Sequence, residues 1–276
     1  MGSIFRTFKF MGRVLAMIGT NRKLLRPLLI NVAIAAPVMA VLSLVMEFAV
    51  GDNIIVEYAV LFVGVTALYF IDYFAGGLAV SMVYDQVTAG NAEMSNAWKR
   101  TSKATGGILI FAAISAVLDL LQNAANQSKG VVADILVAIV RSLWSTAIFV
   151  VMPSMVIEGK GFGEAFSRSK SLMEHDPTQV GVGIIGVGLI TSIFSTLILV
   201  AAVGLFTVLE GISVLAAVFA SLILINLAWA VAGYLKAVYY TCFYVWTLEC
   251  EKQGAAVIAF APGPLRESLD DVHLAA

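Results

Sequence analysis

The chain has 276 residues, of which 60% are hydrophobic and only 13% charged, with a mean hydropathy of +0.94 and a formal net charge of −1. Soluble domains carry roughly 25% charged residues, so this composition excludes a water-soluble fold. The apolar residues form long blocks between charged clusters, which is typical of an all-α polytopic membrane helix bundle, because backbone polar groups in lipid must be paired within their own helix. A membrane β-barrel would instead require alternating strands of about ten residues.

Six apolar blocks follow one another along the chain. We predict transmembrane helices at residues 28–50, 55–84, 107–121, 131–152, 180–205 and 212–234. The third block is near the lower limit of about 17 residues for crossing a hydrocarbon core about 30 Å thick, and the sixth is expected to continue as helix into the interface. The predicted organisation is one transmembrane domain, residues 1–250, followed by a cytoplasmic C-terminal tail, residues 251–276.

Three segments outside these blocks have helical amphipathic patterns, at about residues 3–23, 92–104 and 161–176. Each places apolar side chains on one face and basic side chains on the other, which predicts a helix lying in the membrane interface. The basic side chains are expected to contact anionic lipid headgroups. The predicted headgroup contacts are Arg6, Lys9, Arg13, Arg22, Lys23, Lys99, Arg100 and Arg168.

Lysine and arginine are distributed unevenly between the two sides of the predicted bundle. Residues 1–27 hold six, 92–104 hold three, 160–170 hold three and the tail holds two, whereas the alternate loops hold only Lys129. Cytoplasmic loops of membrane proteins are enriched in these residues. The sequence therefore predicts a multi-pass protein of the cell membrane with both termini in the cytoplasm.

The segments before the third and fifth blocks resemble each other. Ala97-Trp98-Lys99-Arg100 matches Ala165-Phe166-Ser167-Arg168, 68 residues further on, and the segment around Phe5-Arg6 is a weaker third copy. This pattern predicts a unit of one amphipathic helix and one two-helix hairpin, used three times. A chance match over four residues is the alternative.

Arg141 lies inside the fourth block, where a guanidinium costs at least about 2.5 to 3.5 kcal/mol and requires an acidic partner. The candidates are Asp119, near the outer end of the third block, and Asp72, in the second. Two interpretations remain: a structural ion pair that fixes how the helices pack, or an ion or solute path, which Asn226 would also line. Asp72 has the further alternative of lying at the cytoplasmic interface.

Other motifs point to packing rather than chemistry. The glycines at 181, 183 and 186 satisfy the pattern of a dinucleotide-binding loop, but they lie inside an apolar block, so we interpret them as helix-packing residues and expect no cofactor. Glu158-Gly159 is interpreted as a helix-end charge followed by a C-terminal cap. No set of side chains predicts a metal site or a catalytic constellation.

One region of the sequence is similar to a known family. Residues 144–170 carry the resemblance, through Trp144, Pro153, Glu158-Gly159, Ala165 and Ser169. In this spacing, and over residues 5–210 as a whole, the chain resembles a prokaryotic family of six-span membrane proteins known as a domain of unknown function. It is also loosely similar to the membrane domain attached to some glycerophosphodiester phosphodiesterases. The resemblance implies a fold but no reaction.

Three functions are compatible with this sequence. We expect a non-enzymatic scaffold or accessory subunit of a membrane assembly, with membrane lipids and either a protein partner or a second copy as its contacts, and no nucleic acid. The alternative is a transporter or channel with a polar path at Arg141, and the third is a lipid-modifying enzyme, by analogy alone. A polar cavity reaching Arg141 would favour transport, and a dry bundle would favour assembly.

Overall fold

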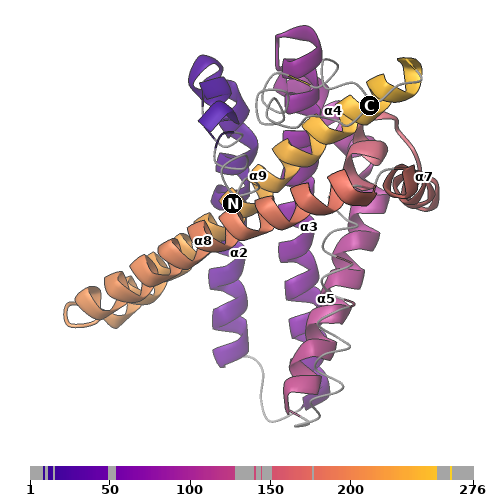
Figure 1. Ribbon diagram of the computed structural model, residues 1–276. Coiled ribbons are helices and arrows are strands. Elements are labelled where there is room, and N and C mark those ends of the chain that lie inside the picture. Colours follow the sequence, from indigo (N-terminus) through magenta and orange to yellow (C-terminus); the bar gives the residue numbers. More distant parts are fainter. Residues whose placement is uncertain are drawn as a thin grey trace.

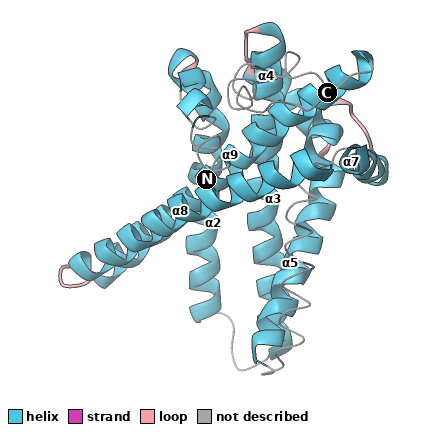
Figure 2. Ribbon diagram, in the orientation of Figure 1, coloured by secondary structure: helices cyan, strands magenta, loops and turns pink. Residues whose placement is uncertain are grey.

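The computed structural model describes residues 12–14, 16–48, 54–127, 151–175 and 177–253, together with the single residues 9, 140, 144 and 262 (Figure 1). Figure 2 shows that the described part consists of helices joined by short loops, and it contains no strand. The predicted all-α fold is therefore confirmed. Beyond Gln253 only residue 262 is described, so the tail stays a prediction.

Three long helices run side by side in Figure 1: α2 (Arg26–Phe48), α3 (Ile54–Ala89) and α5 (Thr105–Gln127). Helix α3 is the central element, since it packs against α2, α5 and α9. At a rise of 1.5 Å per residue it is about 54 Å long, which exceeds the membrane core of about 30 Å. It is followed by Gly90, whose φ of 71° is the left-handed conformation of a helix C-terminal cap.

Helices α8 (Pro177–Leu209) and α9 (Val214–Gln253) form a hairpin that crosses the other three obliquely (Figure 1). Helix α9 packs on α2 and α3, whereas α8 packs mainly on α9 and touches α7. Many side chains of the hairpin are apolar and exposed, including Leu197, Val200, Val203 and Val208. This is the surface that a membrane-embedded helix presents to lipid.

Short helices gather at one end of the bundle, which we name the basic end. They are the 3-10 helix η1 (Arg22–Leu25), α4 (Met94–Lys103) and α7 (Phe162–His175). Side-chain bonds hold them there: Asn21, before η1, donates to Gln86 of α3 at 2.8 Å, and Arg100 of α4 donates to Asp85 of α3 at 2.6 Å. The opposite end of the bundle is named the far end.

Five of the described helices are long and apolar enough to cross a membrane, and they correspond to five of the six predicted spans. The third is longer than predicted, because α5 continues to Gln127. The sixth continues as far as Gln253. The fourth predicted span, 131–152, lies almost entirely outside the described residues, so the sixfold count stays a prediction. Helix α4 precedes α5 and α7 precedes α8, as the repeat predicts, but the threefold repeat is not confirmed.

The contact between α3 and α4 depends on Gly77. A Cβ atom at this position would lie 2.8 Å from the Cγ2 atom of Thr101, a fully buried side chain of α4. Threonine is branched at Cβ and cannot move aside easily. We therefore expect Gly77→Ala to lower the stability of the detergent-purified protein by about 1 to 3 kcal/mol, measured as a decrease in apparent melting temperature.

The neighbouring Gly76 is the matched control, since a Cβ atom there meets no other atom within 4 Å. Gly76→Ala should be neutral or stabilising by about 0.5 to 1 kcal/mol, because alanine is favoured over glycine inside a helix. Equal melting temperatures for the two variants would contradict the described packing of α4.

Candidate functional site

Helix α3 presents a row of polar and aromatic side chains near its middle. Tyr69, Asp72, Tyr73 and Gly76 follow the i, i+3, i+4, i+7 spacing and therefore share one face of the helix. Asp72 lies about 27 Å along α3 from Ile54, far from both ends. Its side chain is half-buried, although it lies within an apolar helix. Asp72 lines two cavities.

The other helices direct polar side chains at the same face. On α9, Asn226, Trp229, Gly233 and Lys236 lie on one face, at the positions i, i+3, i+7 and i+10. Gly233 lies beside Asp72 of α3, since a Cβ atom at this position would be in van der Waals contact with the carboxylate, 3.4 Å from its Oδ1 atom. Further groups come from three more helices: Asn31 of α2, Ser115 and Asp119 of α5, and Thr191, Ser192 and Ser195 of α8.

Hydrogen bonds fix the carboxylates. The Nδ2 atom of Asn31 donates to Oδ1 of Asp72 at 2.7 Å, which connects α2 to α3. The hydroxyl of Tyr69 donates to Asp119, which connects α3 to α5. Lys236 attracts Asp72 electrostatically from α9. Because an uncompensated charge in a bilayer costs several kcal/mol, these contacts let carboxylates remain at this depth.

A second set of bonds lies one helical turn closer to the basic end. The hydroxyl of Tyr73 and the Oγ atom of Ser115 are 2.8 Å apart, and the Nε1 atom of Trp144 donates to the same Oγ atom at 2.9 Å. Trp144 thereby joins the described part of the 131–152 segment to this site. Arg141, the residue on which the sequence analysis centred, lies outside the described residues.

Two cavities meet at these residues. The first, which we name the wide cavity, has a volume of about 290 Å³ and is lined by Tyr73, Ser115, Ser195 and Lys236 among others. The second, named the acidic cavity, has a volume of about 200 Å³. Its charged lining residues among those described are Asp72 and Asp119.

Four residues line both cavities, and we name them the partition: Tyr69, Asp72, Asp119 and Trp229. The acidic cavity adds Val65 and Leu68 of α3, one turn toward the far end, whereas the wide cavity adds Tyr73, toward the basic end. The residues of α9 that line the two cavities are offset along that helix in the same way. The cavities are therefore arranged in series along the helices, on opposite sides of the partition.

The structure brings three of the four predicted intramembrane residues together, since Asp72, Asp119 and Asn226 all line the acidic cavity. The interfacial alternative for Asp72 stays a prediction, since α3 is longer than a membrane core is thick. Asp119 is further from the helix end than predicted, because α5 extends to Gln127. The sequence analysis missed Lys236, since the sixth span was ended at Tyr234. The signal that could have found it is the shared helical face of Asn226, Trp229 and Lys236.

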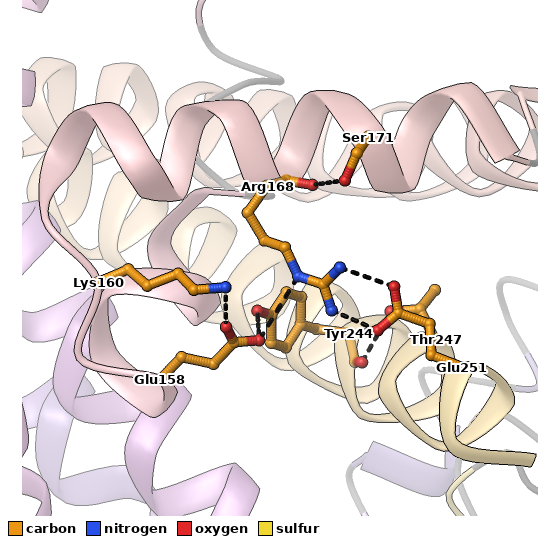
Figure 3. Close-up of polar contacts among 7 residues, drawn as sticks. All are labelled: Glu158, Lys160, Arg168, Ser171, Tyr244, Thr247 and Glu251. Carbon is orange, nitrogen blue, oxygen red and sulfur yellow. Dashed lines mark hydrogen bonds and ion pairs between the residues drawn. The ribbon is translucent and has the colours of Figure 1, made fainter.

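At the basic end, a second cluster connects α7 to the end of α9 (Figure 3). The Nη1 atom of Arg168 donates to Glu251 at 2.7 Å, and its Nη2 atom contacts the other oxygen of that carboxylate. Glu158 accepts from Tyr244 and pairs with Lys160, while the Nε atom of Arg168 lies 3.8 Å from it. We name these residues the polar junction.

The backbone at Glu158 agrees with its predicted role as a helix-end charge. A helical segment ends at residue 157, the N–H of Glu158 donates to the carbonyl of Ser154 at 3.2 Å, and Gly159 has a φ of 68°. The turn points the carboxylate back at α7 and α9. Glu158 therefore joins three elements as well as ending one helix.

The predicted headgroup contacts fall into two groups. Exposed side chains belong to Lys9, Arg13, Arg22, Lys23 and Lys99. Arg100 and Arg168 are instead engaged with carboxylates of the protein itself. Arg6 lies outside the described residues. Contact with lipid headgroups stays a prediction for all of these positions.

The junction determines the ionisation of Glu158. Partial burial raises the pKa of this carboxyl, but hydrogen bonds from Lys160 and Tyr244 and the charges of Lys160 and Arg168 outweigh it, so the pKa lies below its ordinary value of 4.5. Arg168 has a raised pKa, and the largest cause is its own hydrogen bonding to Glu251.

This lowered pKa predicts how stability depends on pH. Because the folded-state pKa of Glu158 is depressed, its contribution is fully present above pH 4.5 and is lost as the pH falls through the lower folded-state value. We expect Glu158→Gln to lower the apparent melting temperature at pH 7 by about 2 to 4 °C, corresponding to about 1 kcal/mol. The difference in melting temperature between this variant and the wild type should become smaller below pH 4.5.

The control for this measurement is Glu164→Gln, which removes an exposed carboxylate from the same helix, α7. This variant should match the wild type at every pH. The melting temperature of Glu158→Gln could instead stay below that of the wild type by a constant amount down to pH 3, roughly a full unit below the ordinary carboxyl pKa. That result would mean that the junction does not hold Glu158 ionised.

The comparisons with known proteins identify a family but no activity. The model of the family described as "Family of unknown function (DUF6159)" matches residues 55–254, further toward the C-terminus than the predicted range of 5–210. No curated protein matches the chain. The expected similarity to the membrane domain of glycerophosphodiester phosphodiesterases is not supported, which removes the basis for a lipid-modifying enzyme. With its apolar, membrane-length helices, the chain belongs to this family of unknown function.

Proposed function

We propose that this protein provides a path by which a small polar solute crosses the membrane. The observation that carries the proposal is the arrangement of the wide and acidic cavities in series on opposite sides of the partition. Both cavities lie among helices that are long enough to span a bilayer. Each has room for several water molecules, since one water occupies about 30 Å³ in the liquid.

The free-energy cost of burying charged side chains at the centre of the bundle favours transport over a purely structural role. Replacing a buried ion pair by apolar residues is often neutral or stabilising, so a bundle that only had to pack would not need Asp72, Asp119 and Lys236 at its centre. All three side chains are half-buried although they lie within apolar helices, and their accessible surface lines a cavity. Charges placed in this way serve the molecule that enters the cavity.

The partition is also the barrier. The Tyr69 and Trp229 rings are stacked with their centroids 6.2 Å apart, and the Tyr69 hydroxyl is bonded to Asp119. A solute can pass from one cavity to the other only when these rings separate. The two cavities would then open to opposite sides of the membrane in turn, as in alternating access.

The uneven distribution of lysine and arginine predicts how this path is oriented in the membrane. We place the basic end in the cytoplasm and the far end outside the cell membrane, because lysine and arginine gather on η1, α4 and α7. The wide cavity then lies on the cytoplasmic side of the partition and the acidic cavity on the outer side.

A second candidate function is that of a scaffold or subunit in a membrane assembly. The observation in its favour is the α8–α9 hairpin, of which α8 packs mainly on α9 and exposes apolar side chains such as Leu197 and Val203. A cysteine at Val203 that forms cross-links to another membrane protein would support this role. It would not conflict with a solute path through the partition.

The solute path predicts which positions water-soluble reagents can reach. In a background with Cys242 and Cys250 replaced by serine, Ser195→Cys should react with a charged thiol reagent added on the side of the basic end, since Ser195 lines the wide cavity. Ala35→Cys should react from the opposite side, since Ala35 lines the acidic cavity. The measurement is labelling of the purified protein in oriented liposomes.

Each position has a neighbour at the same depth that points outward. Thr196 and Ile34 are exposed on the outer surfaces of α8 and α2, so cysteines there should remain unlabelled in lipid. If the cavity cysteines react no faster than these neighbours, the cavities are dry and the transport proposal is wrong.

A further inference from the structure

The acidic cavity has an apolar wall on the side of the far end. Apolar side chains of α2 and α3 form this wall: Ala35, Met39, Leu68 and Val65. They lie about one and two helical turns beyond Asn31 and Asp72, which are hydrogen-bonded to each other. This part of the cavity therefore suits an aliphatic group rather than a polar one.

The carboxylates of the cavity already have partners within the protein. Asp72 accepts a hydrogen bond from Asn31 and is attracted by Lys236. Asp119 accepts a hydrogen bond from the Tyr69 hydroxyl. A ligand therefore does not have to bring a positive charge, and a charged ligand would lose its hydration on entering a cavity with an apolar wall. The cavity is better matched by an uncharged molecule.

One hydrogen-bond acceptor in the lining has no partner. Asn226 of α9 is only 6% exposed, and its Oδ1 atom has no hydrogen-bond partner within the described part of the chain. A buried oxygen without a donor is costly, so a bound molecule that supplies the donor is favoured. The last torsion of an asparagine side chain has broad preferences, so the amide can turn toward such a donor. We therefore expect the ligand to carry an N–H or O–H group.

We propose that the acidic cavity binds a small uncharged amphiphile, whose N–H or O–H group donates to Asn226 and whose aliphatic part lies against Met39 and Val65. A mostly apolar wall with a few polar groups that fix the orientation of the ligand is typical of pockets for small organic molecules. The volume of about 200 Å³ limits the ligand to a small molecule. This inference rests on the proposed path and names the class of solute that uses it.

The site is tested by equilibrium binding to the full-length protein in lipid nanodiscs, which does not require transport. Calorimetry is the readout, and empty nanodiscs provide the background. The probe is hexanamide, which is compared with its isomer N,N-dimethylbutanamide, which has no N–H donor, and with hexanediamide, which has an amide at both ends. Hexanamide should bind about tenfold more tightly than either. The isomer leaves Asn226 without a donor, and the diamide places a polar group against Met39 and Val65.

Two variants test the two ends of the ligand. Met39→Gln should weaken the binding of hexanamide and strengthen that of hexanediamide, because the second amide group then meets a polar side chain. Asn226→Leu should reduce the affinity for hexanamide to that for its isomer. Leu29→Gln is the matched control, since it adds the same amide group to α2 at a side chain that is 63% exposed and lines neither cavity. This control should bind all three amides as the wild type does.

Three results would overturn the inference: no binding of hexanamide, an affinity for hexanamide no higher than that for its isomer or the diamide, or unchanged selectivity in both Met39→Gln and Asn226→Leu. The first two are measured on the wild type, so they decide the question even if a variant does not fold. Cysteine labelling from both sides without hexanamide binding would leave the path intact and remove only its solute class. Hexanamide binding without labelling from both sides would leave a binding site and remove the path.

Discussion

The hydrogen bond from Asn31 to the carboxylate of Asp72 is the interaction on which the centre of this bundle depends. It joins α2 to α3 at 2.7 Å, and it leaves the carboxylate facing Lys236 of α9. A carboxylate in an apolar layer is costly, so α2, α3 and α9 must stay close enough to supply both partners. Gly233 packs beside the carboxylate, where a Cβ atom would be in ordinary van der Waals contact with it. Cavities rather than a dry core result, since polar groups from five helices converge around Asp72 and Asp119.

The two polar clusters have complementary roles. The polar junction connects α7 and the end of α9 through Arg168 and Glu251, at a level where water and headgroups are available. Since α7 leads into α8, the junction determines where the α8–α9 hairpin begins and where it ends. The hairpin in turn carries Trp229 and Lys236 to the partition. A structural ion cluster at the basic end thus positions a hairpin that carries Lys236 to the wide cavity.

The membrane helices were readily predicted from sequence, whereas the site was predicted only in part. Apolar blocks gave α2 and α3 to within a few residues, because hydrophobic length decides where a helix can cross a bilayer. Asp72, Asp119 and Asn226 were found because polar groups are rare in such blocks. Lys236 was missed because the predicted membrane span ended at residue 234, two residues before it. The bond from Tyr69 to Asp119 joins residues 50 positions apart, and no local pattern indicates it.

The central claim is that the polar groups inside this bundle line a path for a small polar solute. The most direct test is uptake of a panel of radiolabelled small polar solutes, both charged and neutral, by liposomes that contain the purified protein. At least one solute should enter faster with the wild type than with Asp119→Asn. Uptake of every solute by the wild type at the rate of protein-free liposomes would contradict the account.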